Sequence, residues 1–164
     1  MTMYSKSLVD DATELLAACR TNGLRIATAE SCTGGLISGL LTAVPGSSDV
    51  VDRGFVTYTN EAKHEMLGVP DDLFATQGAV STEVARAMAA GVLERSDADL
   101  AVGVTGVAGP GGGTATKPVG LVHLSACRKG GATIDERCVF SGDRSDVRIQ
   151  AVAVALEMLR ALAE

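Results

Sequence analysis

Two glycine-rich turns, each directly after a short β-branched run, constrain the fold of this chain most. The first turn, 29–35, follows the run 24–28, and the second, 105–113, follows the run 100–104. A strand that leads into small, hydroxyl-bearing residues lets backbone N–H groups approach an anion closely. The first turn also opens a predicted helix, whose amino terminus favours negative charge. Neither glycine spacing fits a Walker A or dinucleotide motif. The pair of turns predicts a site for a phosphate-bearing small molecule.

Strand and helix signals alternate along the rest of the chain. Apolar residues at helical spacing, with caps and glycine stops, predict helices over residues 7–22, 33–43, 60–66, 81–95 and 144–163. β-rich runs predict strands over 24–29, 53–58, 99–105, 119–127 and 133–140, the last two joined as a hairpin. Asn60 and Asp143 are the predicted caps of the third and last helices. This alternation predicts one α/β domain over 1–164, layered α/β/α around a mixed sheet.

Composition narrows the classes of partner. The net charge of −6 argues against a nucleic-acid backbone as the main ligand, although it leaves room for a local basic pocket. No run approaches the roughly 18 apolar residues that span a bilayer, and the amino terminus resembles no signal core. The four cysteines show no C-x-x-C spacing, which indicates reduced thiols. We therefore expect a cytoplasmic protein with no membrane partner.

Ligands in open α/β sheets bind beyond the carboxyl ends of the strands. Segments 29–35, 57–63 and 105–113 all follow predicted strands. The first offers hydroxyl and thiol groups beside exposed amides, in Ser31, Cys32 and Thr33. Each glycine turn also has a purely structural interpretation. The first is then a helix cap with small residues for tight packing, and the second is a surface loop.

The middle segment carries groups for acid–base chemistry. Tyr58 ends a predicted strand and Lys63 lies about one turn into the next helix, so both can face one pocket. A lysine that is shielded from water loses its proton more readily and then serves as a base. Ser48 lies in a loop ten residues before Tyr58, and a Ser–Lys pair needs no histidine. The structural alternative is that Lys63 is a solvated lysine on a helix and Ser48 an ordinary turn residue.

Other polar residues carry weaker signals. His64 and His123 are far apart and lack metal-ligand spacing, so no metal site is predicted. Cys32 lies near a helix amino terminus, where a thiolate is favoured, but the sequence offers it no partner base. Arg144 and Arg148 lie one turn apart and are candidates for a phosphate, with an exposed helix face as their ordinary role.

Several ordered motifs together closely resemble the CinA C-terminal domain family. They cover nearly the whole chain, at residues 29–35, 45–48, 54–63, 78–81, 105–113, 117–120 and 140–144. The stand-alone members of this family are nicotinamide-nucleotide amidohydrolases, which convert nicotinamide mononucleotide and water to nicotinate mononucleotide and ammonia. The resemblance implies a three-layer α/β/α fold with a mixed, mostly parallel five-stranded sheet. It also implies that deamidation needs no metal or other cofactor.

The resemblance further implies a serine nucleophile with lysine and tyrosine partners. By position these roles carry over to Ser48, Lys63 and Tyr58, with Ser31 as the main rival nucleophile and Ser47 also plausible by chemistry. The expected substrate-binding residues are Glu30, Ser31, Cys32, Thr33, Gly34, Gly35, Thr105, Gly106, Gly109 and Arg144. Among them the glycine turns and Arg144 suit the phosphate, Glu30 the ribose or the cationic ring, and amides near 47–48 or 105–106 the oxyanion.

Two other functions use the same features. A non-catalytic nucleotide-sensing module needs the glycine turns but not the relation between Tyr58 and Lys63. An amidase for a carboxamide without phosphate leaves both glycine turns structural. Alanine-rich helices suit a homodimer surface as well as internal packing, and we expect a homodimer.

Overall fold

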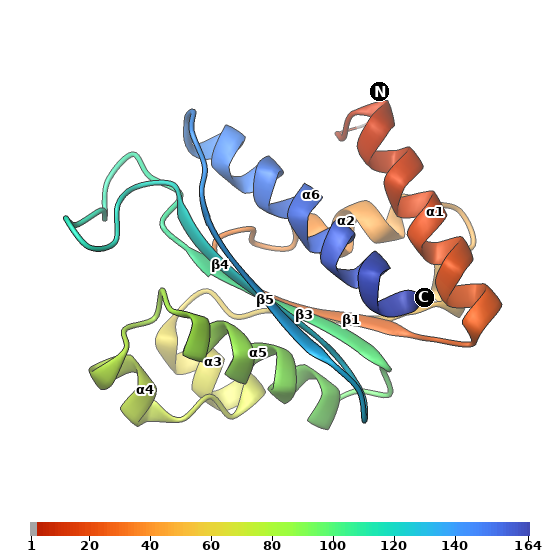
Figure 1. Cartoon of the computed structure of the whole chain (residues 1–164), viewed down its shortest axis with the longest axis horizontal. Helices are drawn as coiled ribbons and strands as arrows, with labels where there is room; N and C mark the ends of the chain where they lie inside the picture. Colours follow the sequence, from red (N-terminus) through yellow and green to blue (C-terminus); the bar gives the residue numbers. More distant parts are fainter. Residues whose placement is uncertain (1–2) are drawn as a thin grey trace.

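Five strands form one mixed sheet with helices on both faces (Figure 1). The computed structural model describes residues 3–164, so the first two residues of the predicted domain 1–164 lie outside the described residues. In chain order the elements are α1 (Lys6–Asn22), β1 (Ile26–Glu30), α2 (Leu36–Thr42), the 3-10 helix η1 (Ser47–Asp49), β2 (Val51–Val56), α3 (Asn60–Leu67), α4 (Asp71–Thr76), α5 (Thr82–Glu94), β3 (Leu100–Gly106), β4 (Leu121–Arg128), β5 (Thr133–Val139) and α6 (Arg144–Ala163).

The strand order is β2-β1-β3-β4-β5. β1 pairs in parallel with β2 and β3, whereas β4 pairs antiparallel with β3 and β5. The predicted mixed five-stranded sheet is confirmed. "Mostly parallel" describes the strand directions, because only β4 is reversed, but half of the neighbouring pairs are antiparallel. The carboxyl ends of β1, β2 and β3 therefore meet at one edge of the sheet.

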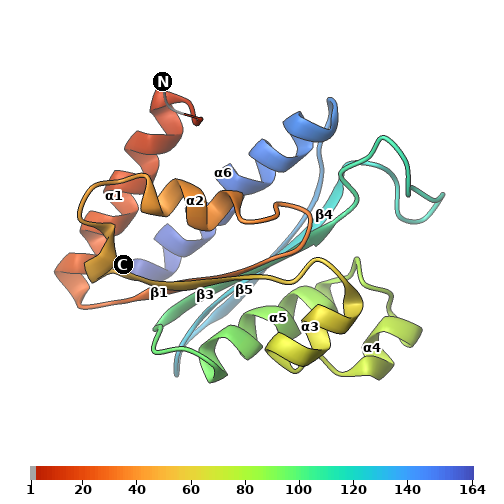
Figure 2. The ribbon, with the colours of Figure 1, turned by 180° about the vertical axis from the view of Figure 1, so that it is seen from behind.

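Helices α1, α2 and α6 cover one face of the sheet, and α3, α4 and α5 cover the other (Figures 1 and 2). Side chains of β3 alternate between the two faces of the sheet and contribute to both helix layers. Leu100, Val102 and Val104 join the core under α1, α2 and α6, while Ala101 packs with the α5 layer. Gly103 faces α5 so closely that an added Cβ would lie 2.5 Å from the Ala85 carbonyl oxygen. Small residues on this face let α5 lie close to the sheet.

Most predicted helix boundaries hold, because they rest on local cap chemistry. Gly23 and Gly68 end α1 and α3 in the left-handed conformation, at φ 66° and 68°. Ser81 caps α5, and Asp143 forms a capping box on α6. The cap of α3 was predicted wrongly: the Thr59 hydroxyl accepts from the Ala62 amide, so Asn60 is the first helical residue.

Three differences concern the site. The helix predicted over 33–43 begins only at Leu36, because Gly34 and Gly35 take φ values of 57° and 101° in the preceding turn. β2 runs over 51–56, so Tyr58 lies in the loop beyond the strand. The sequence prediction missed α4, although Pro70 followed by two aspartates is a helix-start signal.

Candidate active site

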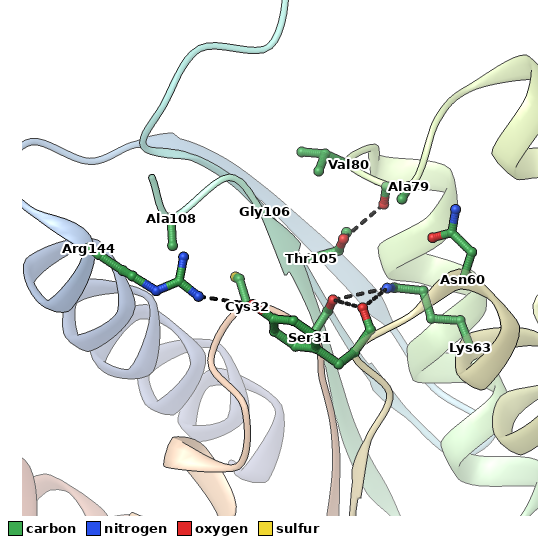
Figure 3. Close-up of a pocket in the computed structure, with 11 residues that line it drawn as sticks. Ser31, Cys32, Asn60, Lys63, Ala79, Val80, Thr105, Gly106, Ala108 and Arg144 are labelled. Atoms are coloured by element: carbon green, nitrogen blue, oxygen red, sulfur yellow. Dashed lines mark hydrogen bonds between the residues drawn. The ribbon is translucent and has the colours of Figure 1, made fainter. Parts of the chain in front are cut away.

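A pocket of about 210 Å³ opens where β1, β2 and β3 end. Its walls come from the two predicted glycine turns, the start of α3, the loop before α5 and the first residue of α6 (Figure 3). The lining residues are Ser31, Cys32, Tyr58, Asn60, Lys63, Ala79, Val80, Thr105, Gly106, Ala108 and Arg144. Three strand ends that meet at one edge thus bring together side chains from across the sequence, as expected for an open α/β sheet.

Ser31 and Lys63 form a hydrogen-bonded pair at the bottom of this pocket. The Lys63 Nζ atom lies 2.9 Å from the Ser31 Oγ atom (Figure 3). Ser31 directly follows β1, and its backbone amide donates to the Val104 carbonyl at 3.0 Å, which ties the serine to β3. Lys63 comes from the first turn of α3. Their separation is in the range that a nucleophile and its general base require.

Lys63 is an unusual lysine because only 2% of its surface is exposed. Its other hydrogen bond goes to the Tyr58 carbonyl oxygen at 3.4 Å, and within residues 3–164 it has no carboxylate partner within ion-pair distance. Burial lowers the pKa of Lys63, while Cys32 and Glu61 oppose the shift. A buried amine without a counter-ion is disposed to be neutral and therefore to accept a proton.

Ser48, the serine expected to pair with Lys63, does not do so. It is an exposed residue of η1, just before β2. The neighbouring Val50 carbonyl accepts from the amide of Ile26, the first residue of β1, whereas Ser31 follows the last residue of β1. Ser48 and Lys63 therefore lie at opposite ends of the sheet, about 20 Å apart at the usual rise per strand residue. Ser47 is buried in the same remote helix.

Tyr58 and Arg144 meet across the pocket mouth. The Arg144 guanidinium donates to the Tyr58 hydroxyl at 2.9 Å and to the Gly109 carbonyl at 2.8 Å. The Tyr58 hydroxyl is thus not placed between Lys63 and a serine, as a proton relay would require. Instead its backbone carbonyl accepts from both members of the pair, with Ser31 Oγ at 3.5 Å.

Replacing Tyr58 with phenylalanine therefore tests two roles. If the hydroxyl only orients Arg144, kcat/KM is expected to fall about 10- to 100-fold, the value of one hydrogen bond to a charged group, with most of the change in KM. A fall of several hundred-fold in kcat alone would instead indicate that the Tyr58 hydroxyl takes part in proton transfer. Steady-state kinetics on the purified variant separate these results.

Glu30 is not a ligand-binding group in this structure. It is fully buried, and its carboxylate accepts from the amides of Ile37 at 2.8 Å and Ser38 at 3.0 Å. Because these amides are the free donors at the start of α2, Glu30 occupies the helix terminus that was predicted to attract an anion. The expected contact with ribose or a cationic ring is therefore a wrong prediction.

This arrangement predicts a stability role for Glu30. Glu30→Ala leaves the buried Ile37 amide and the half-buried Ser38 amide without an acceptor and is expected to lower the free energy of unfolding by about 2 kcal/mol. Denaturant unfolding of the variant, beside the exposed-residue control Glu65→Ala, measures the difference. An unchanged midpoint would show that water replaces the carboxylate.

The rest of the first glycine turn supports the site rather than lining it. Thr33, Gly34 and Gly35 are absent from the pocket wall, unlike Ser31 and Cys32. Arg148 donates to the carbonyls of Cys32 at 3.0 Å and Thr33 at 3.2 Å. It therefore holds the turn that carries Ser31 and is not free for a phosphate through those donors. The Cys32 amide donates to no other residue within 3–164.

The second glycine turn contributes only its first part. Thr105 and Gly106 line the pocket, and the Thr105 hydroxyl donates to the Ala79 carbonyl at 2.8 Å. Gly109 contributes its carbonyl to Arg144. Residues 110–116 are exposed, and the loop extends beyond the sheet (Figures 1 and 2).

Thiols and imidazoles take no part in the Ser31–Lys63 pair. Burial raises the pKa of Cys32 to about 11, which keeps its sulfur protonated at neutral pH. His64 contacts the Val69 carbonyl at 2.9 Å, and His123 contacts Thr82 at 3.1 Å. Among residues 3–164 no group of three or more His, Cys, Asp or Glu side chains is arranged to hold a metal ion. No helix in this range is long and apolar enough to cross a bilayer.

The sequence prediction missed three contributors to the pocket, namely Asn60, the segment 79–80 and Ala108. Asn60 was taken as a helix cap, although the preceding threonine offers an equally good cap. Ala79, Val80 and Ala108 carry no chemical signal, because only their place in the fold brings them to the wall.

Fold and site together define an α/β domain with a buried serine–lysine pair at the carboxyl edge of its sheet. The chain belongs to the CinA family: the model of the CinA C-terminal domain matches residues 9–163.

Comparisons with known proteins agree with this family. The chain is 48% identical over 155 residues to nicotinamide-nucleotide amidohydrolase PncC of Enterobacter agglomerans, covering 94% of each chain. It is 52% identical to a CinA-like protein of Mycolicibacterium vanbaalenii, covering 94% of this chain but 36% of that one. Among solved structures, competence/damage inducible protein CihA of Agrobacterium tumefaciens is 49% identical, with a TM-score of 0.98 and full coverage of both chains. ComA of Klebsiella pneumoniae is 36% identical, with a TM-score of 0.90 over 94% of this chain and 95% of that one.

Proposed function

We propose that this protein is a nicotinamide-nucleotide amidohydrolase in which Ser31 is the nucleophile and Lys63 the general base. The observation that carries the proposal is the buried Ser31–Lys63 pair, 2.9 Å apart and facing a pocket. The name of the PncC relative supports nicotinamide mononucleotide as the substrate. Ser31, the main rival nucleophile by its sequence position, thus takes the role that the family resemblance implied for Ser48.

The first half of the reaction forms an acyl-enzyme. Neutral Lys63 takes the hydroxyl proton of Ser31 as Oγ bonds to the carboxamide carbon. The Cys32 amide beside the nucleophile, which donates to no other residue within 3–164, is the candidate donor to the oxyanion, a role typically worth about 2.7–4 kcal/mol. Protonated Lys63 then gives its proton to the amide nitrogen, the C–N bond breaks, and ammonia leaves.

The second half reverses these roles. Water attacks the acyl carbon as Lys63 takes one of its protons, and the bond from the carbon to Ser31 Oγ breaks. Lys63 returns the proton to Oγ, which restores the pair and leaves the acid product. No step requires a metal or cofactor.

Arg144 is our candidate for the phosphate. Its guanidinium has five N–H donors, and its contacts with Tyr58 and Gly109 occupy only part of them. Among the described residues no carboxylate lines the pocket, which suits the end of the substrate that carries negative charge. The cationic pyridinium ring then lies against neutral groups and neutral Lys63.

Ammonia release from nicotinamide mononucleotide by the purified protein tests this function. We expect the wild-type enzyme to release ammonia and to form an equal amount of nicotinate mononucleotide. Tight nucleotide binding with no release would favour the sensing module. Release from phosphate-free nicotinamide at a similar kcat/KM would favour the general amidase.

The proposal includes a cytoplasmic location and a homodimer formed by single-domain subunits. Sedimentation analysis of the purified chain tests the dimer, and a monomer at micromolar concentration would contradict it.

A further inference from the structure

Asn60 is an exposed polar side chain at the pocket, without a hydrogen-bond partner among residues 3–164. It is the first residue of α3, one position after the N-cap, and the Thr59 hydroxyl caps this helix by accepting from the Ala62 amide at 3.0 Å. Within residues 3–164, the Asn60 carboxamide makes no hydrogen bond to the protein, and Asn60 lines the pocket. Its donors and acceptor are therefore available to a ligand.

The position of Asn60 relates it directly to the reacting pair. It precedes Lys63 by three residues on the same helix, so the two side chains share one face, with Cβ atoms about 5–6 Å apart. Figure 3 shows Asn60 beside Lys63, on the side of the pocket nearest Ala79. A carboxamide that reaches Ser31 thus passes next to the Asn60 side chain.

The other side chains of the pocket offer few acceptors for a substrate N–H group. Lys63 and Arg144 are donors when charged, and Ser31 is the nucleophile. The Tyr58 hydroxyl already accepts from Arg144. The Thr105 hydroxyl gives its one proton to the Ala79 carbonyl, and its lone pairs remain as a weaker acceptor than an amide oxygen. None of the lining residues within 3–164 is a carboxylate. In the described part of this wall, Asn60 Oδ1 is the strong side-chain acceptor that has no partner.

We infer that Asn60 determines specificity for the carboxamide by accepting a hydrogen bond from its –NH₂ group, so that the pocket prefers the amide substrate over the acid product. This inference rests on the proposed function. An amide nitrogen donates to Oδ1, whereas the product carboxylate has only acceptor oxygens and contacts Asn60 only if the side-chain amide turns its Nδ2 donors toward it. With Oδ1 facing the substrate, the amide gains a hydrogen bond that the acid does not. The same contact orients the leaving nitrogen and assists release of the acid.

The test compares binding of the amide and the acid in an enzyme that cannot turn over. Calorimetry in the Ser31→Ala background measures Kd for nicotinamide mononucleotide and for nicotinate mononucleotide. Adding Asn60→Ala is expected to weaken amide binding about 5- to 10-fold, the value of one hydrogen bond, and acid binding less than 2-fold. The Thr59 cap remains in this variant, so α3 is expected to form. Glu65→Gln, on an exposed position of α3 outside the pocket, is the matched control and is expected to change neither value.

Asn60→Asp is expected to change the ratio of the two dissociation constants in the opposite direction from Asn60→Ala. Its carboxylate still accepts from the amide but repels the acid, so the ratio of acid Kd to amide Kd is expected to rise above that of the parent. Both ligands share the cationic ring, so its attraction to the new charge cancels in this ratio.

An unchanged ratio in both variants, or equal weakening of amide and acid, would overturn the inference. The proposed function fails separately, in the wild-type ammonia assay, and the inference then fails with it. If the wild-type enzyme releases ammonia while the ratio does not respond to Asn60, only the inference is wrong.

Discussion

Ser31→Ala is expected to lower kcat for nicotinamide mononucleotide by at least about 1000-fold, with KM within a few-fold of wild type. The substitution removes the atom that would form the acyl bond, while the walls that bind the substrate remain. Steady-state ammonia release, with wild-type protein diluted to matching rates, measures the ratio.

Ser48→Ala is the matched control, because Ser48 is exposed at the other end of the sheet. It is expected to keep wild-type kcat and KM. The account is contradicted if Ser48→Ala is inactive and Ser31→Ala remains active, since the nucleophile would then be the serine that this fold places away from Lys63.

Lys63→Met is expected to lower kcat by about 100- to 10,000-fold, the usual contribution of a general base. It is expected to do so without loss of stability. Methionine fills a similar volume, and it removes the cost of burying an amine that has no carboxylate partner in the described chain. An unfolding midpoint at or above that of wild type, together with the loss of turnover, identifies a residue retained for chemistry.

The pH dependence follows from the same burial. Because Lys63 acts as a base when neutral and its pKa is lowered, kcat/KM is expected to rise with pH and level off below the ordinary lysine pKa of about 10.4. The unfolded chain regains that ordinary pKa and binds more protons between the two values. The contribution of Lys63 to stability therefore rises with pH across this window, and the rise is absent in Lys63→Met. A rate that falls with pH there would contradict the role of Lys63 as a base.

Much of the fold was predictable because its signals are local. Caps, glycine stops and apolar periodicity identified α1, α3, α5 and α6 nearly to the residue, and the turn at 128–132 identified the β4–β5 hairpin. The order of the strands was not predictable, because pairing across the sheet depends on packing between distant segments. The start of α2 was missed because only backbone geometry shows that Gly34 and Gly35 take left-handed conformations before the helix.

The site was predictable in its parts and less so in its pairing. Sequence placed Lys63 and the first glycine turn beyond strand ends, but it chose Ser48 as the partner of the lysine. Ser48 precedes β2 whereas Ser31 follows β1, and the parallel pairing of β1 with β2 places these two positions at opposite ends of the sheet. Glu30 was misread for a similar reason: its carboxylate is directed toward α2, which the periodicity of the sequence does not reveal.

Rapid-quench mass spectrometry of the enzyme with nicotinamide mononucleotide tests the central claim most directly. The account predicts an acyl adduct on the peptide that contains Ser31, formed with the release of ammonia and converted by hydroxylamine to the hydroxamate. An adduct on Ser48 or Cys32, or ammonia release with no acylated Ser31 peptide at any quench time and no hydroxamate, would contradict it.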